Sequence, residues 1–267
     1  MIDAKKLFPK KYLSQNFLVD PHTALRIIQA CQLTKENIVL EIGPGQGALT
    51  RELAKQTGQV YAVEKDENLC ALLRTQLPAN VKLLNEDILN LDFATLPDGL
   101  IVIGNLPYNI STPIIEKLIE NRQQIKKSFI TVQWEFGQRL AARPGKKDYG
   151  ALTCFVQYHA DVKILFKIGR ACFRPSPKVF SCFAEIHFRE PTLKANDEAF
   201  FSKIVRAAFS QRRKMISNTL KTVIHPQDLA KILTELRLPG HARAENITVE
   251  DYVKISNKVK RVKGKND

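Results

Sequence analysis

A glycine-rich turn between an apolar strand and a helix constrains the fold of this chain more than any other segment. The apolar residues 38–42 predict a buried strand, the sequence Gly43-Pro44-Gly45-Gln46-Gly47-Ala48 follows it, and residues 49–55 are compatible with a helix. Glycines at such a turn let the backbone come close to a bound nucleotide. The order of strand, glycine-rich turn and helix therefore predicts the first unit of an α/β sheet with a ligand at its carboxyl edge.

Further apolar runs alternate with helix-compatible stretches along the first two thirds of the chain. They predict additional strands at residues 60–64, 81–84, 100–103 and 128–133. This alternation indicates an α/β fold with a doubly wound sheet. Residues 162–168 and 181–188 show β-type alternation and frame a loop with two prolines, so we expect an antiparallel hairpin there.

Two carboxylates follow predicted strands. Glu64 closes the strand that contains Val60–Val63, and Asp87 follows the strand at 81–84. A carboxylate at the end of an apolar strand needs a partner, and Glu64 is suited to ribose hydroxyls. The glycine turn and Glu64 also fit a dinucleotide site, so NAD and S-adenosylmethionine are both compatible with them. Asp87 favours S-adenosylmethionine because it can accept from the amino group of a bound adenine, although a solvated turn acid or a helix cap is the alternative.

The tetrad Asn105-Leu106-Pro107-Tyr108 directly follows the predicted strand at 100–103 and Gly104. The exocyclic amine of adenine is a poor nucleophile because its lone pair is delocalised into the ring. Two acceptors, the Asn105 side-chain oxygen and the Leu106 carbonyl, would favour the pyramidal amine, and Tyr108 offers a face on which a base can stack. The tetrad therefore predicts methylation of a base amine, with an ordinary strand-to-helix turn and a surface tyrosine as the alternative.

Composition indicates an anionic partner. The formal net charge is +14 in 267 residues, which favours nucleic acid first and an acidic membrane surface second. No apolar run approaches the ~18 residues needed to span a bilayer, and the basic N-terminus lacks the apolar core of a signal peptide, so we expect a cytoplasmic protein. The five cysteines and five histidines lack ligand spacing, which predicts free thiols and no metal site.

The pattern changes from strand to helix near Glu190-Pro191, where we place a domain boundary between residues 1–190 and 191–267. Apolar residues then recur with helical spacing around 200–209, 229–236 and 249–253, the last behind a Thr248 cap. This second segment contains 16 Lys and Arg against 8 Asp and Glu. It therefore predicts a small basic helical domain that docks RNA, with Arg212-Arg213-Lys214 and the run 258–265 as its strongest basic clusters.

Taken together, these segments resemble the KsgA-type rRNA adenine dimethyltransferases over almost the whole chain. The resemblance rests on motifs that occur in the family's order: Gln15–Leu18, Glu41–Thr50, Glu64, Asp87, Asn105–Tyr108, Phe173–Val179, Phe209–Lys214 and Arg243–Asn246. It implies a Rossmann-like class I methyltransferase sheet and the dimethylation at N6 of two adjacent adenines in the 3′-terminal hairpin loop of 16S rRNA. It also implies S-adenosylmethionine as the cofactor and an immature small ribosomal subunit as the partner of a monomeric enzyme.

The resemblance assigns roles to particular residues. The implied cofactor contacts are Asn16, Leu18, Gly43, Glu64, Asp87 and Asn105. The implied catalytic residues are Asn105, Leu106, Tyr108 and Phe173, with Phe173 stacking on the target adenine opposite Tyr108. Two alternatives stay open: a large-subunit 23S rRNA dimethyltransferase that confers macrolide resistance, and a ribosome-assembly factor whose RNA binding matters more than its catalysis.

Overall fold

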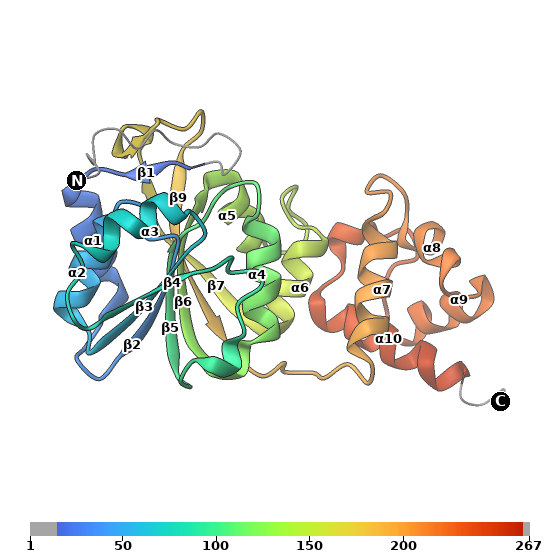
Figure 1. Ribbon diagram of the computed structural model, residues 1–267. Coiled ribbons are helices and arrows are strands. Elements are labelled where there is room, and N and C mark those ends of the chain that lie inside the picture. The colour runs from blue at the N-terminus through green and yellow to red at the C-terminus, as the bar shows by residue number, and fades with distance from the viewer. Residues whose placement is uncertain (1–14, 264–267) are drawn as a thin grey trace. The chain divides into compact units, whose positions relative to one another are not determined.

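The computed structural model describes residues 15–263, which divide between two compact units (Figure 1). The first, here called the sheet unit, comprises the chain up to Gly137 together with Val162–Phe188. The second, the helical unit, comprises Gln138–Asp161 and the chain from Arg189 onward. The chain enters the helical unit twice, so residues 138–161, which the sequence analysis grouped with the first domain, belong to the helical unit.

A mostly parallel sheet organises the sheet unit. In the described part of the chain its strands have the order β4-β3-β2-β5-β6-β9-β7. The strands β4, β3, β2, β5 and β6 are parallel to one another, whereas β9 is antiparallel to β6. The bounds are β2 (Ile38–Ile42), β3 (Gln59–Glu64), β4 (Val81–Asn85), β5 (Leu100–Asn105), β6 (Ile125–Gln133), β7 (Ala160–Ile168) and β9 (Ser181–Phe188). This arrangement confirms the predicted doubly wound α/β fold and each of its predicted strands.

Helices cover both faces of this sheet (Figure 1). The helices are α1 (Pro21–Cys31), α2 (Ala48–Gln56), α3 (Glu67–Arg74) and α4 (Ser111–Glu120). Helix α5 (Trp134–Leu140) spans the division between the two units, which falls after Gly137. The chain runs from β2 to β3 to β4 in one direction and from β5 to β6 in the other. Because parallel crossovers are right-handed, α2 and α3 lie on one face and α4 lies on the opposite face.

Burial on both faces explains why the strands read as continuous apolar runs. Leu100, Val102 and Ile103 of β5 are completely buried. The face below α1 and α2 forms one apolar cluster in which Ile27 and Leu53 pack with residues from several strands. The strands β2 and β5 are parallel, but the chain connections run outward from them in opposite directions along the sheet. The turns after these two strands therefore diverge and leave a crevice at the carboxyl edge.

A second, two-stranded sheet joins distant parts of the sheet unit. β1 (Phe17–Leu18) pairs in antiparallel fashion with β8 (Phe173–Arg174), with Leu18 opposite Phe173. The segment before α1 thereby contacts the proline-containing loop that precedes β9. These strands of two residues were not predicted, because each is too short to show a periodic pattern.

The helical unit forms around its own core. Its helices are α6 (Ala151–His159), α7 (Glu198–Phe209), α8 (Ile216–Thr219), α9 (Pro226–Glu235) and α10 (Val249–Lys263). Completely buried side chains of this core include Ile204, Leu220 and Tyr252. The predicted Thr248 cap is confirmed, since its Oγ1 accepts from the backbone N–H of Asp251 at 3.1 Å. The basic run at 258–265 extends beyond the described residues.

Short 3₁₀ segments complete the secondary structure; they are η3 (Phe93–Thr95), η4 (Arg122–Gln124), η5 (Arg170–Cys172), η6 (Leu220–Thr222) and η7 (Ala244–Asn246). No helix among residues 15–263 is long and apolar enough to cross a membrane. The cysteines are free thiols, and burial raises the pKa of Cys70 and Cys182 to about 11.

Candidate active site

A pocket of about 300 Å³ opens at the carboxyl edge of the sheet, where the turns after β2, β3, β4 and β5 meet. Both predicted carboxylates and the whole tetrad reach it. Its lining consists of Gln15, Asn16, Phe17, Ile42, Gly43, Gly45, Val63, Glu64, Lys65, Glu86, Asp87, Ile88, Leu89, Asn105, Leu106, Pro107, Tyr108, Asn109, Ile110 and Ile114. Its position is the one expected for a ligand in an open α/β sheet.

The glycine turn shapes one wall of the pocket. Gly43 and Gly45 have φ values of +69° and +59°, a region that disfavours residues with a side chain. A Cβ at Gly45 would lie 2.9 Å from the Phe17 ring. The turn is also tied to the neighbouring strand, because the Gly43 N–H donates to the Val63 carbonyl at 3.0 Å. The glycines therefore leave room where a bound ligand meets the backbone.

Glu64 is the buried carboxylate of the pocket, with 7% of its surface exposed. One oxygen accepts from the Gly45 N–H at 3.2 Å and the other from the Asp66 N–H at 2.8 Å. Burial raises the pKa of Glu64 above its ordinary value, and these backbone hydrogen bonds oppose the shift. Each oxygen retains acceptor capacity toward the pocket, which suits the two hydroxyls of a ribose.

Asp87 lies at the rim, with 18% of its side chain exposed. Burial would raise its pKa, but hydrogen bonds from Lys65 and the Leu89 N–H, together with the Lys65 charge, outweigh burial and lower the pKa. The Lys65–Asp87 ion pair measures 2.8 Å. Asp87 is thus held as a carboxylate that can accept from an amino group in the pocket.

Asn105 is held in one orientation by a hydrogen bond across the sheet unit. Its amide Nδ2 donates to the Asn16 carbonyl at 2.8 Å, which turns Oδ1 in the opposite direction. Within the described residues neither Asn105 Oδ1 nor the Leu106 carbonyl accepts a hydrogen bond. Both residues line the pocket. The site therefore offers two neighbouring acceptors for an external donor with two hydrogens.

Tyr108 forms a half-buried wall beside these acceptors. Its hydroxyl is 2.7 Å from Oγ of the completely buried Ser181. Burial raises the pKa of Tyr108, so the ring carries a neutral phenol at physiological pH. The hydrogen bond to β9 fixes the ring on its outer end, which leaves its face available to a planar ligand.

Two predicted site residues lie outside the pocket wall. Leu18 and Phe173 oppose each other in the β1–β8 sheet and pack in the apolar cluster beneath α1 and α2. Leu18 is 7% exposed and Phe173 is completely buried. The expectation that the Phe173 ring faces Tyr108 is not met in this conformation, because the strand pairing turns that ring into the core.

The apolar part of the pocket was not predicted from the sequence. Phe17 lines it because successive residues of a strand point in opposite directions, which places Leu18 in the core. Ile42 and Val63 end β2 and β3, and Ile88 and Ile114 add further apolar surface. A strand-end position was the one signal available for Ile42 and Val63, while Ile88 and Ile114 carry no distinguishing pattern.

The side chains that line the pocket fit S-adenosylmethionine. Glu64 matches ribose hydroxyls, Asp87 matches an adenine amino group, and apolar residues such as Ile88 provide surface for the adenine ring. The glycine turn provides the space that a Cβ would fill. Asn105 lies between the part of the pocket suited to the methyl donor and Tyr108, where a methyl group would be transferred.

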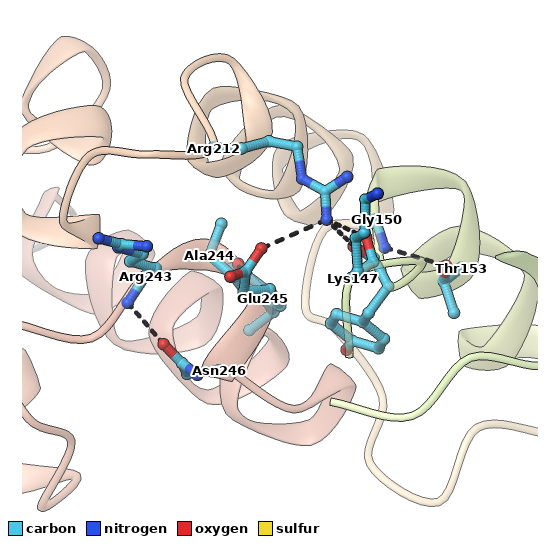
Figure 2. Close-up of polar contacts among 10 residues, drawn as sticks. Lys147, Gly150, Thr153, Arg212, Arg243, Ala244, Glu245 and Asn246 are labelled. Atoms are coloured by element: carbon cyan, nitrogen blue, oxygen red, sulfur yellow. Dashed lines mark hydrogen bonds and ion pairs between the residues drawn. The ribbon is translucent and has the colours of Figure 1, made fainter. Parts of the chain in front are cut away.

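The helical unit contains the predicted basic cluster Arg212-Arg213-Lys214, and Figure 2 shows the contacts of Arg212 with Glu245 and with the segment around Lys147. Arg212 hydrogen-bonds to the carbonyls of Lys147 and Tyr149 and forms an ion pair with Glu245 at 3.3 Å. The neighbouring Arg213 and Lys214 are exposed, and within the described residues neither is paired with a carboxylate. Arg212 thus ties three segments of the unit together, whereas its two neighbours face solvent.

The chain is similar to known proteins along nearly its whole length. The family model for ribosomal RNA adenine dimethylase matches residues 8–261. A "Ribosomal RNA small subunit methyltransferase A" from Desulforapulum autotrophicum is 40% identical over 96% of this chain and 94% of its own length. The protein of that name from a Geobacillus strain is 36% identical over 95% and 92%.

Solved structures show the same architecture. The 23S rRNA methyltransferase ErmE is 27% identical, with a TM-score of 0.73 over 92% of this chain and 100% of its own. A dimethyladenosine transferase from Plasmodium falciparum gives a TM-score of 0.76 at 24% identity, over 94% of this chain and 98% of its own. The family match covers nearly the whole sequence and includes every pocket residue described above. The chain belongs to the ribosomal RNA adenine dimethylase family and is an S-adenosylmethionine-dependent adenine methyltransferase.

Proposed function

We propose that this enzyme dimethylates N6 of two adjacent adenines in the 3′-terminal hairpin loop of 16S rRNA, acting on an immature small ribosomal subunit in the cytoplasm as a monomer. The observation that carries the proposal is the pair of acceptors at Asn105 Oδ1 and the Leu106 carbonyl. They stand beside the Tyr108 ring and across from the carboxylates suited to the methyl donor. The relatives named for the small subunit, at 36% and 40% identity, support the choice of RNA.

The residues would act by orientation. A loop adenine leaves the RNA stack, which costs least for an unpaired base, and its ring rests on Tyr108. Asn105 and Leu106 accept the two amine hydrogens, which directs the nitrogen lone pair out of the ring plane. Bound S-adenosylmethionine would supply the electrophilic sulfonium methyl group and leave as S-adenosylhomocysteine. The alkylated nitrogen is acidic and loses its proton to water, so no strong base is required.

The second transfer uses the same residues with one change. N6-methyladenine has one amine hydrogen, so only one of the two acceptors can be engaged. The other acceptor then adjoins the methyl group, and Ile110 and Ile114 add apolar surface to the pocket. The stacking role predicted for Phe173 stays a prediction that requires its ring to leave the core on RNA binding.

The helical unit is the proposed site of RNA docking. Its exposed Arg213 and Lys214 suit phosphates, and the unit as a whole is strongly basic. Docking by this unit would hold the subunit while the sheet unit receives the base. If docking alone is the essential activity, the protein acts mainly as an assembly factor.

A second candidate substrate follows from one observation. ErmE, a 23S rRNA methyltransferase, shares 27% identity with this chain and aligns along its full length. The lower identity than that of the small-subunit relatives makes the large subunit the weaker candidate. The two substrates require the same chemistry at Asn105, so the pocket does not separate them.

Transfer of labelled methyl groups tests the proposal. Undermethylated small subunits, large subunits and naked 16S and 23S RNA would be incubated in parallel with the enzyme and labelled S-adenosylmethionine. We expect label in 16S rRNA, recovered as N6,N6-dimethyladenine at two neighbouring positions after nuclease digestion. Label confined to 23S RNA would favour the second candidate, and binding to small subunits without any transfer would favour the assembly role.

A further inference from the structure

A cluster of aromatic and cationic side chains lies beside Tyr108 in the sheet unit and is not used by the chemistry above; three of its members are exposed and Trp134 is half-buried. It consists of Trp134, Phe180, Lys167 and Arg170, here called the aromatic–basic platform. Lys167 Nζ lies 4.0 Å from the centroid of the Phe180 ring and 5.0 Å from that of Trp134. The Arg170 guanidinium lies 5.4 Å from the Phe180 centroid.

Phe180 is exposed to an unusual degree for a large apolar residue. Its relative exposure is 44%, and that of the preceding Val179 is 46%. One exposed apolar residue has no meaning by itself. Here, however, the ring is accompanied by the cations Lys167 and Arg170, and the backbone N–H of Trp134 donates to the Phe180 carbonyl at 2.9 Å, which holds the backbones of the two aromatic residues together. The platform is therefore a fixed surface.

The charge of the surrounding segment has one sign. Residues 162–180 contain Lys163, Lys167, Arg170, Arg174 and Lys178 and no Asp or Glu. Within the described residues, neither Lys167 nor Arg170 forms an ion pair. Cations that no carboxylate neutralises, placed beside exposed aromatic rings, are the combination with which proteins bind single-stranded nucleic acid.

The platform is continuous with the site of the target base. Phe180 precedes Ser181, whose hydroxyl hydrogen-bonds to Tyr108. Trp134 follows β6, and β6 pairs with β5 so that Thr131 lies opposite Asn105. Along the sheet, the residues suited to the methyl donor lie at the ends of β2, β3 and β4, and Asn105 and Leu106, which accept from the base, lie at the end of β5. In the chain, the platform residues come after β6 and before β9. A nucleotide next to the target adenine would lie on the side away from the methyl donor.

We infer that the aromatic–basic platform binds the RNA strand that flanks the target adenine. A neighbouring unpaired base stacks on Phe180 and Trp134, and the backbone phosphates contact Lys167 and Arg170. This inference rests on the proposed function, because it assigns a second contact to the same RNA. The occupant is RNA and not protein, since aromatic stacking and the positive charge of Lys167 and Arg170 suit a single strand.

The chain's single tryptophan makes the platform directly observable. Trp134 fluorescence would be recorded for the full-length enzyme during titration with a 16S hairpin RNA that carries the unmethylated loop. We expect RNA to quench this emission and S-adenosylmethionine alone to leave it nearly unchanged. Binding of the hairpin with no change in Trp134 emission, measured by an independent method, would place the RNA elsewhere.

Substitutions test the energetic part of the inference. Phe180→Ala should weaken hairpin binding by about 5- to 100-fold, the range expected for one lost base stack, and should raise the KM for RNA. Phe180→Tyr should retain affinity, whereas Phe180→Leu should not, because leucine keeps apolar area but lacks a π face. Lys167→Ala should reduce affinity and flatten its salt dependence.

Matched controls come from the same unit. Leu25 on α1 is 46% exposed, and Lys82 forms a cation–π pair with Tyr61 at 5.3 Å on the β3–β4 side of the sheet. Leu25→Ala and Lys82→Ala should leave RNA binding and Trp134 quenching unchanged. Calorimetric binding of S-adenosylmethionine by every variant confirms that the pocket is folded.

The outcomes separate the inference from the proposed function. If the wild-type enzyme transfers methyl groups but Phe180→Ala has the wild-type KM and affinity for the hairpin, the platform assignment is wrong and the proposed function stands. If the wild-type enzyme neither binds nor methylates the RNA, both fail. If Phe180→Ala loses binding to whole subunits but binds the naked hairpin like wild type, the platform contacts another part of the subunit and its assignment to the strand that flanks the target adenine is wrong.

Discussion

Replacement of Asn105 by alanine separates catalysis from binding most sharply. The change removes the Oδ1 acceptor beside the Leu106 carbonyl and also the 2.8 Å hydrogen bond from Nδ2 to Asn16. Loss of one preorganised polar group at a reacting atom costs about 10²- to 10³-fold in kcat, or roughly 3–4 kcal/mol. The lost bond to Asn16 costs only about 0.5–1.5 kcal/mol of stability. We therefore expect a slow but folded enzyme.

The assay must distinguish the two functions of this side chain. Turnover is measured at saturating S-adenosylmethionine, so that any weakening of donor binding through Asn16 does not enter kcat. Affinity for the RNA hairpin is measured separately and should change little, because Tyr108 is intact. Asn105→Asp tests the orientation: a carboxylate cannot donate to the Asn16 carbonyl, so this variant should also be slow although it retains an acceptor.

Asn109 provides a matched control. It is an exposed asparagine that lines the same pocket four positions further along the chain. Asn109→Ala should retain turnover within a few-fold of wild type. Near wild-type turnover by Asn105→Ala under saturating donor would refute the acceptor role of Asn105, and with it the orientation mechanism.

Three further predictions follow from the remaining contacts. Asp87→Ala should weaken S-adenosylmethionine binding in calorimetry by roughly 1–3 kcal/mol, the cost of leaving a polar partner unsatisfied, and tight NADH binding in place of the methyl donor would contradict the assignment. The double change Arg213→Ala and Lys214→Ala should lower RNA affinity and reduce the slope of log affinity against log salt by up to about 0.9 per lost phosphate contact on duplex-like RNA. Arg212→Ala should instead lower the melting temperature, because it removes the contacts with Tyr149 and Glu245, and an equal loss of melting temperature in both variants would refute these separate roles. Burial raises the pKa of Glu41 from its ordinary value of 4.5 to about 8, so its contribution to stability is fully present below pH 4.5 and is lost as pH rises through 8. In denaturant unfolding, Glu41→Gln should therefore match wild type at low pH and gain stability relative to it as pH rises, with a slope of up to about 1.4 kcal/mol per pH unit. A pH-independent difference between the two proteins would contradict the shift.

The parts of the fold that could be predicted depend on local causes. β5 was recognisable because burial on both faces makes Leu100–Ile103 a continuous apolar run. The turn after β2 was recognisable because Gly43 and Gly45 adopt positive φ, for which glycine is the favoured residue. Asn105 was recognisable because it follows a strand, and strand ends define the ligand edge of such a sheet.

The parts that could not be predicted depend on pairing between distant segments. Phe173 has the composition of a stacking residue, but its pairing with Leu18 buries it. Arg212 and Arg213 are adjacent and chemically identical, yet only Arg212 meets Glu245 and the carbonyl of Tyr149. A sequence pattern gives both arginines the same assignment, since the difference arises from which chain segments fold against each one.

The order of the strands also explains why one asparagine links donor and acceptor. Gly43 follows β2, Glu64 ends β3 and Asp87 follows β4, on one side of the point between β2 and β5 where the order of the connections reverses, and Tyr108 follows β5 on the other side. Asn105 ends β5 at that point, with its Nδ2 bonded to Asn16 and its Oδ1 left to the base. A single amide group thereby fixes the position of the base acceptor relative to the wall of the donor site. Glutamine in its place would carry the same two groups on a side chain one methylene longer, so it could keep the Asn16 bond or the position of the base acceptor, but not both.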